Sequence, residues 1–66
     1  MKLAAKNNAV ELAWNAFDAA SLRLKAMYTG EVEATREERL QQSLEQARAW
    51  YGFLSAFVSE NPEVAA

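Results

Sequence analysis

The second half of the chain carries a long series of apolar residues at helical spacing. They recur at alternating steps of four and three, which is the spacing of one face of an α-helix. The series consists of Leu40, Leu44, Ala47, Tyr51, Leu54 and Val58. Trp50, Phe53 and Phe57 widen this stripe on one side. The pattern predicts a helix over residues 36–59 with an apolar face too wide for one partner helix to cover.

The first half predicts a second helix of similar length, over about residues 8–29. Its stripe has the same alternation, with a serine in one position: Val10, Trp14, Phe17, Ser21, Leu24 and Tyr28. Leu22 is an exception, because it projects from the polar side. Two stripes of equal length predict an antiparallel hairpin. The expected pairs are Tyr28–Leu40, Leu24–Leu44, Ser21–Ala47, Phe17–Tyr51, Trp14–Leu54 and Val10–Val58.

Local signals mark the ends of both helices. Asn7 or Asn8 is a suitable N-cap for the first helix, and Gly30 can adopt the left-handed conformation that ends it. Residues 30–35 form a short connector. The sequence from Thr35 to Glu38 reads Thr-Arg-Glu-Glu, a capping box that predicts the start of the second helix. Asn61 and Pro62 end that helix, and residues 60–66 are expected to be a loose tail.

The predicted fold is therefore a single all-α domain over residues 1–66, a two-helix antiparallel hairpin. A lone hairpin has a seam but no enclosed core. Leaving three or four large side chains in water forgoes on the order of 5–10 kcal/mol, comparable to the stability of a small domain. We therefore expect a homodimer that forms a four-helix bundle. Its expected interface comprises Trp14, Phe17, Leu24, Tyr28, Leu44, Ala47, Trp50, Tyr51, Phe53, Leu54 and Phe57. The alternative is an intramolecular core with the first six residues folded over it.

Small residues form two further faces whose role stays open. One is a row of alanines beside the first stripe, at Ala9, Ala13, Ala16 and Ala20. The other comprises Ala49, Gly52 and Ala56 on the outward side of the second helix. Both rows allow a close approach of another helix, but alanine also favours helix formation by itself, and Gly52 can equally be tolerated without a role.

Composition narrows the chemistry. The 66 residues include no cysteine and no histidine, so thiolate sites and the commonest metal ligand and general base are excluded. The paired carboxylates of Glu37 and Glu38 suit a helix start better than acid–base catalysis. The serines have no histidine beside which to act as nucleophiles. We predict no enzyme activity, no catalytic residues, no metal and no cofactor.

Two classes of function remain. The first is a protein–protein interaction module, a small adaptor, regulator or chaperone-like hairpin, with an unidentified protein partner as a further possibility. The alternative is a small nucleic-acid-binding or membrane-surface regulator. The net charge is −2 and no row of Lys or Arg follows a helix face, which disfavours nucleic acid. The longest weakly polar run, residues 49–58, is about half a membrane span. We therefore expect no transmembrane segment and a cytoplasmic protein.

Overall fold

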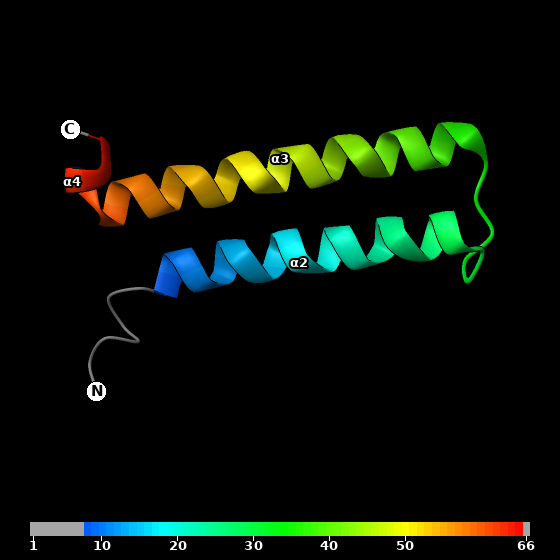
Figure 1. Cartoon of the computed structure of the whole chain (residues 1–66), viewed down its shortest axis with the longest axis horizontal. Helices are drawn as coiled ribbons and strands as arrows, with labels where there is room; N and C mark the ends of the chain where they lie inside the picture. The colour runs from blue at the N-terminus through cyan, green and yellow to red at the C-terminus, as the bar shows by residue number, and fades with distance from the viewer. Residues whose placement is uncertain (1–7, 66) are drawn as a thin grey trace.

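A computed structural model of the chain describes residues 8–65. It contains two long antiparallel helices, α2 (Asn8–Thr29) and α3 (Arg36–Glu60), and a short final helix, α4 (Pro62–Ala65). Figure 1 shows α2 and α3 lying side by side along their whole length, joined by one connector. The described part of the chain is all-helical, so the predicted fold class and hairpin are confirmed.

The turn that leaves α2 has the predicted glycine geometry. Gly30 adopts φ +89°, the left-handed region in which a side chain would be strained. The backbone N–H of Val32 donates to the Ala26 carbonyl over 3.1 Å, which closes the end of the helix. At the other end α2 begins at Asn8. The predicted cap at Asn7 lies outside the described residues.

The capping box at the start of α3 is confirmed in both directions. The backbone N–H of Glu38 donates to Thr35 Oγ1 over 3.1 Å, and the Thr35 N–H donates to Glu38 Oε1 over 2.8 Å. These bonds satisfy two donors that a helix start otherwise leaves free. Glu37 and Glu38 also place negative charge in the first turn of α3, where the helix dipole favours it.

The prediction of a loose tail over residues 60–66 is wrong for most of that segment. Glu60 still belongs to α3, and Asn61 ends the helix by donating its backbone N–H to the Phe57 carbonyl over 2.9 Å. Pro62 then begins α4. Proline cannot continue a helix, but its fixed φ suits the first position of a new one. The same residue that stops α3 therefore starts the short helix.

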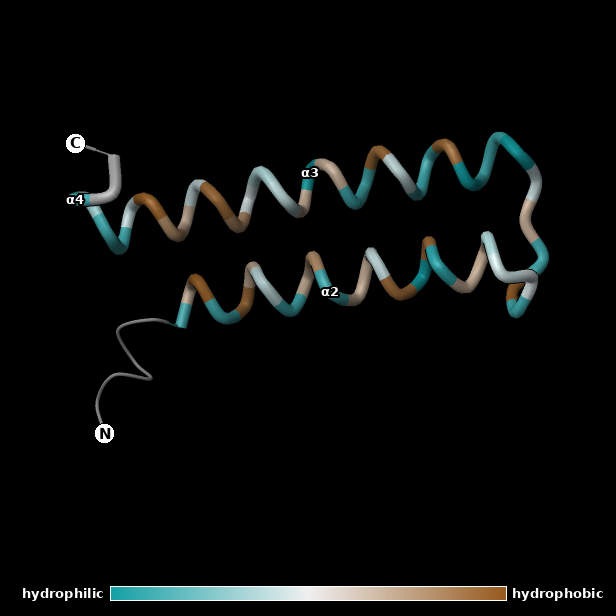
Figure 2. The backbone as a smooth tube through the Cα atoms, in the orientation of Figure 1, coloured by the Kyte–Doolittle hydropathy of each residue, from teal (hydrophilic) through white to brown (hydrophobic). Residues whose placement is uncertain are grey.

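The hairpin is a single layer of helices without an enclosed interior. It measures 42 × 27 × 12 Å along its principal axes. Among residues 8–63 no apolar side chain is buried, and Gln42 is the only buried residue, at 7% exposure. Figure 2 shows hydrophobic stretches recurring along both helices. Because one layer cannot enclose side chains, much of this apolar surface stays in contact with water.

Candidate interaction surface

Five aromatic side chains form the seam at the end of the hairpin away from the connector. We call Trp14, Phe17, Trp50, Phe53 and Phe57 the aromatic cluster. Across the seam, the ring centroids of Phe17 and Trp50 are 5.1 Å apart, and those of Trp14 and Phe53 are 5.2 Å apart at an interplanar angle of 66°. Such tilted arrangements are the favoured geometry of aromatic pairs. The cluster therefore joins α2 to α3.

Two glutamines of α3 form the middle of the seam. The Gln42 side chain donates from Nε2 to the Ala20 carbonyl over 3.1 Å, and the Gln46 side chain donates from Nε2 to Ser21 Oγ over 2.9 Å. Gln42 can be buried because its amide finds this carbonyl partner. In the middle of the hairpin, hydrogen bonds of two glutamine side chains therefore join the helices.

Near the connector the seam is closed by an arginine. The Arg39 guanidinium lies 5.5 Å from the centroid of the Tyr28 ring, within the range of a cation–π contact. Its Nη1 also donates to the Ala34 carbonyl over 3.0 Å. Arg39 is thus occupied within the hairpin.

These contacts correct the predicted seam of α3. The prediction placed the stripe from Leu40 to Val58 against α2, with Trp50, Phe53 and Phe57 at its edge. In the structure the glutamines and aromatics face α2 instead, and Leu40 is 62% exposed. The contacts across the seam join Ser21 to Gln46, Phe17 to Trp50 and Trp14 to Phe53, where the prediction paired these three residues with Ala47, Tyr51 and Leu54. Each new partner precedes the predicted one by one residue.

Relative to the prediction, α3 is rotated about its own axis and is not shifted along it. Successive residues of an α-helix are turned by about 100°. Replacing each predicted partner by its neighbour therefore turns α3 by roughly a quarter of a revolution while the two helices keep nearly the same alignment. The bulky Trp and Phe rings then fill the seam, and the regular stripe points outward.

The displaced stripe now forms an open surface, which we call the outer stripe. It consists of Leu40, Leu44, Ala47, Tyr51, Leu54 and Val58. Tyr51 is 72% exposed, Leu44, Ala47 and Val58 are also exposed, and Leu54 is half-buried. Isolated exposed apolar residues are ordinary, but a contiguous row of them marks an interaction surface. The outer stripe extends along most of α3.

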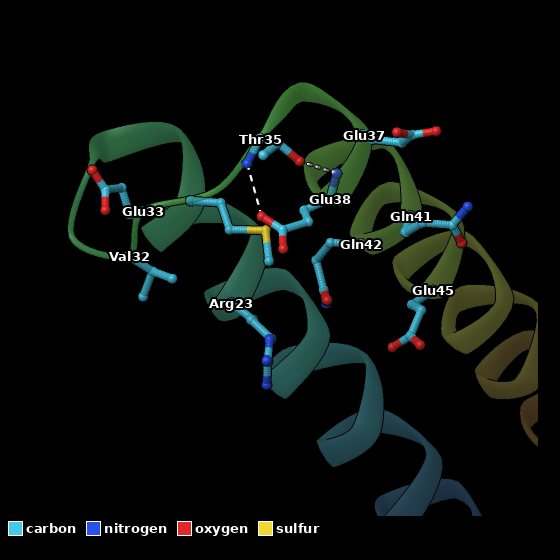
Figure 3. A pocket seen from close by; sticks show the side chains of 10 residues that line it. Arg23, Val32, Glu33, Thr35, Glu37, Glu38, Gln41, Gln42 and Glu45 are labelled. Carbon is cyan, nitrogen blue, oxygen red and sulfur yellow. Dashed lines mark hydrogen bonds between the residues drawn. The ribbon is translucent and has the colours of Figure 1, made fainter.

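The opposite side of the hairpin is polar near the connector. A hollow of about 580 Å³ lies there, lined from α2 by Arg23 and Met27 and from α3 by Glu38, Gln42 and Glu45. Figure 3 shows the labelled side chains around it. No residue of the outer stripe lines this hollow. Around α3, Glu45 lies on one side of the seam and the outer stripe on the other. The hairpin therefore has one polar and one apolar flank along α3.

Charged residues of α2 border the apolar flank. Glu11, Asp18 and Lys25 follow one another at steps of seven, so they lie nearly above each other on one side of α2. All three are exposed. Met27 and Arg23 border the polar hollow, so the helical turn places these three charges on the other flank, beside the outer stripe. On that flank the continuous apolar row belongs to α3.

The small-residue faces differ in their surroundings. Ala13, Ala20, Ala49 and Ala56 are half-buried, whereas Gly52 is exposed. A Cβ atom built on Gly52 has no neighbour within 4 Å. Packing inside the hairpin therefore gives no reason for glycine at this position.

The structure separates the predicted interface residues into two groups. The first group forms or adjoins the seam: Trp14, Phe17, Leu24, Tyr28, Trp50, Phe53 and Phe57. The second lies on the outer stripe: Leu44, Ala47, Tyr51 and Leu54. Trp14 and Trp50 belong to the seam but remain 44% and 38% exposed. The hairpin itself therefore covers the two tryptophans only in part.

Sequence reasoning missed the polar part of the seam. Gln42, Gln46 and Arg39 were not among the expected contact residues, because polar side chains in a helix are ordinarily assigned to water. One signal was present: Gln42, Gln46, Phe53 and Phe57 repeat at steps of four and seven, in phase with Trp50. This second stripe is mixed polar and aromatic, so a hydrophobic pattern alone does not reveal it.

The described residues contain no group of three or more acidic, cysteine or histidine side chains placed to hold a metal ion. No helix among them combines the length and the apolar character needed to cross a membrane. Comparisons of the chain with protein-family models, curated proteins and solved structures find no match.

Proposed function

We propose that this chain is a non-catalytic protein–protein interaction module, a small adaptor, regulator or chaperone-like hairpin that acts through its exposed apolar surface. We further propose that it self-associates as a homodimer, in which the two hairpins make up a four-helix bundle. The proposed assembly is the same as that expected from the sequence. The surface that forms its interface is different, because the hairpin leaves the outer stripe exposed, whereas the aromatic cluster forms its seam.

One observation carries the proposal. None of the apolar side chains of residues 8–63 is buried, while Leu40 and Tyr51 are more than half exposed on one helix. Fully burying a large apolar side chain contributes roughly 1.5–3 kcal/mol. A chain of this size without disulfides usually gains stability by association. Burying the outer stripe against a second chain therefore stabilises the hairpin more than repacking side chains within its single layer does.

The charges of the described residues favour a protein partner over nucleic acid. Arg39 is engaged with Tyr28 and the Ala34 carbonyl. Arg23 borders a hollow that also contains Glu33, Glu38 and Glu45. A phosphate backbone would meet these carboxylates, and it requires a row of free cations instead. A titration of RNA, DNA and anionic vesicles against salt tests this choice. Tight, salt-sensitive binding would favour the alternative function.

Sedimentation equilibrium of the full chain tests self-association. We expect a dimer at micromolar concentration. Tyr51→Glu and Leu44→Glu place a charge on the outer stripe and should give folded monomers with unchanged helical circular dichroism. Leu12→Glu is the matched control, because Leu12 is similarly exposed but lies on α2, and this variant should still dimerise. A wild-type chain that stays monomeric and folded up to millimolar concentration would contradict the proposal.

A further inference from the structure

The outer stripe has the spacing of a coiled-coil seam. Its six positions alternate strictly by four and three residues, from Leu40 to Val58. They cover about 27 Å of helix at the usual rise per residue. Because side chains at these positions interlock with a helix of the same spacing, the surface is suited to a straight helix rather than to an irregular segment.

The sizes of the side chains along the outer stripe allow two copies of it to pack together when the two helices run antiparallel. If a second α3 runs antiparallel and the two cross at the level of Ala49, Leu40 faces Val58 of the second copy and Leu44 faces Leu54. At the centre, the large Tyr51 of each copy then faces the small Ala47 of the other. A parallel pair would set tyrosine against tyrosine and alanine against alanine, which leaves a crowded layer next to an empty one.

A charge at the start of the stripe favours the same orientation. In a parallel pair, Arg36 at the start of α3, which is exposed, would lie beside Arg36 of the second copy. The antiparallel pair separates these two charges, and the dipoles of the two helices also oppose each other in it.

One charge contact opposes the arrangement. Arg48 borders the outer stripe near its middle, and antiparallel pairing brings it close to Arg48 of the second copy. Arg48 is exposed, so water and salt weaken this repulsion. It is one contact at the rim, whereas the apolar pairs occupy every layer of the seam.

The exposed charges of α2, at Glu11, Asp18 and Lys25, determine which helices form the interface between the two copies. A face-to-face packing of both helices of each hairpin would cover Glu11, Asp18 and Lys25 and remove them from water. Burying such groups without matched partners is unfavourable. A contact made by α3 alone leaves them at the edge of the interface.

We infer that the occupant of the outer stripe is the outer stripe of a second copy, with the two α3 helices antiparallel at the centre of the dimer and Tyr51 of each copy packed over Ala47 of the other. This inference rests on the proposed self-association, but it replaces the closed four-helix bundle by a dimer in which only the two α3 helices meet, and it adds the orientation and the alignment of that contact.

Disulfide trapping tests the inference on the full chain, because the natural sequence has no cysteine to interfere. Leu44→Cys and Leu54→Cys chains, one of them labelled with ¹⁵N, are mixed and equilibrated in a glutathione redox buffer. Mass spectrometry then identifies the disulfides. We expect the mixed disulfide, which joins one chain of each variant, to dominate over both like-with-like products. Leu12→Cys, at a similarly exposed position on α2, is the control and should form no preferred disulfide.

The possible results separate this inference from the proposed function. Dominant pairing of Leu44→Cys chains with themselves would show a parallel dimer and overturn the inference. A dimer in sedimentation that gives no preferred disulfide at either position would place the contact elsewhere, for example on the small-residue faces, and would also overturn it. In both cases self-association itself would stand. Monomers at all concentrations would remove both proposals. Dimerisation that needs residues 1–7 and survives Tyr51→Glu would assign the contact to the N-terminal segment and overturn the inference as well.

Discussion

The side-chain amide of Gln46 donates a hydrogen bond to the Ser21 hydroxyl across the seam, over 2.9 Å. The two residues sit between the aromatic cluster and the Arg39–Tyr28 contact. On either side of Ser21, α2 carries Phe17 and Leu24, whose side chains cannot accept a hydrogen bond. A slip of α3 by one turn would therefore leave the amide without this partner, so the contact helps to set the alignment of the helices.

We predict that Ser21→Ala lowers the free energy of unfolding by about 1 kcal/mol, because it removes the acceptor from a half-buried amide. In a chain that already carries Gln46→Leu, Ser21→Ala should lower the free energy of unfolding much less, because no side-chain amide remains without an acceptor. Urea denaturation of the four chains of this double-mutant cycle, at one fixed concentration, measures the coupling. A coupling energy near zero would show that the bond does not stabilise the hairpin.

We predict that Trp50→Ala destabilises the hairpin by about 2 kcal/mol, because the ring packs on Phe17 across the seam. Tyr51→Ala is the matched comparison. Its side chain is the next along the chain but is 72% exposed, so in dilute, monomeric samples it should change the free energy of unfolding by less than about 0.5 kcal/mol. A larger loss for Tyr51→Ala than for Trp50→Ala would indicate that the predicted rather than the observed face of α3 meets α2.

Two glycine-to-alanine changes should have opposite effects. Gly52→Ala is expected to stabilise the chain by up to about 1 kcal/mol, because the position is helical and an added Cβ meets no atom within 4 Å. Gly30→Ala should destabilise it by about 1 kcal/mol or more, because φ is +89° there. Urea denaturation checks both. Loss of dimerisation in Gly52→Ala would assign the glycine to the contact between copies.

Thr35→Ala should cost about 1 kcal/mol by removing the oxygen that caps the Glu38 N–H. Glu38→Gln keeps an oxygen for the Thr35 N–H and should cost less. Glu37→Gln controls for the loss of charge in the first turn, because the capping bonds do not involve Glu37. The variants are compared by urea denaturation followed by circular dichroism. Similar losses for Thr35→Ala and Glu37→Gln would mean that charge, not the capping bonds, stabilises the helix start.

The helices and the connector could be predicted from the sequence because their signals are local. The capping box at Thr35 and Glu38 and the left-handed glycine at Gly30 each act within a few residues. Pro62 correctly predicts the stop of α3. Pro62 also starts α4. This effect depends only on its fixed φ, so it could have been predicted from the sequence as well.

The face that α3 turns toward α2 could not be predicted in the same way. From Ala47 to Val58 the helix is apolar around most of its circumference, so the pattern fits two different faces. Hydrophobic spacing favours the regular stripe because it contains fewer polar residues. The observed face instead uses the reach of Trp50 and Phe53 and the partners that Gln42 and Gln46 find on α2. Side-chain size and hydrogen bonding across the seam decide the face, and hydrophobic spacing records neither.

The single-layer form of the hairpin has a consequence for how it melts. Unfolding raises the heat capacity in proportion to the apolar surface newly exposed to water. A layer in which no apolar side chain of residues 8–63 is fully buried has less such surface to expose than a domain with an enclosed core. At high dilution the isolated chain should therefore unfold over a broad temperature range with a small heat-capacity increment, and its backbone amides should exchange rapidly with deuterium. Any cover over Tyr51 and its neighbours would sharpen the calorimetric transition and slow that exchange along α3.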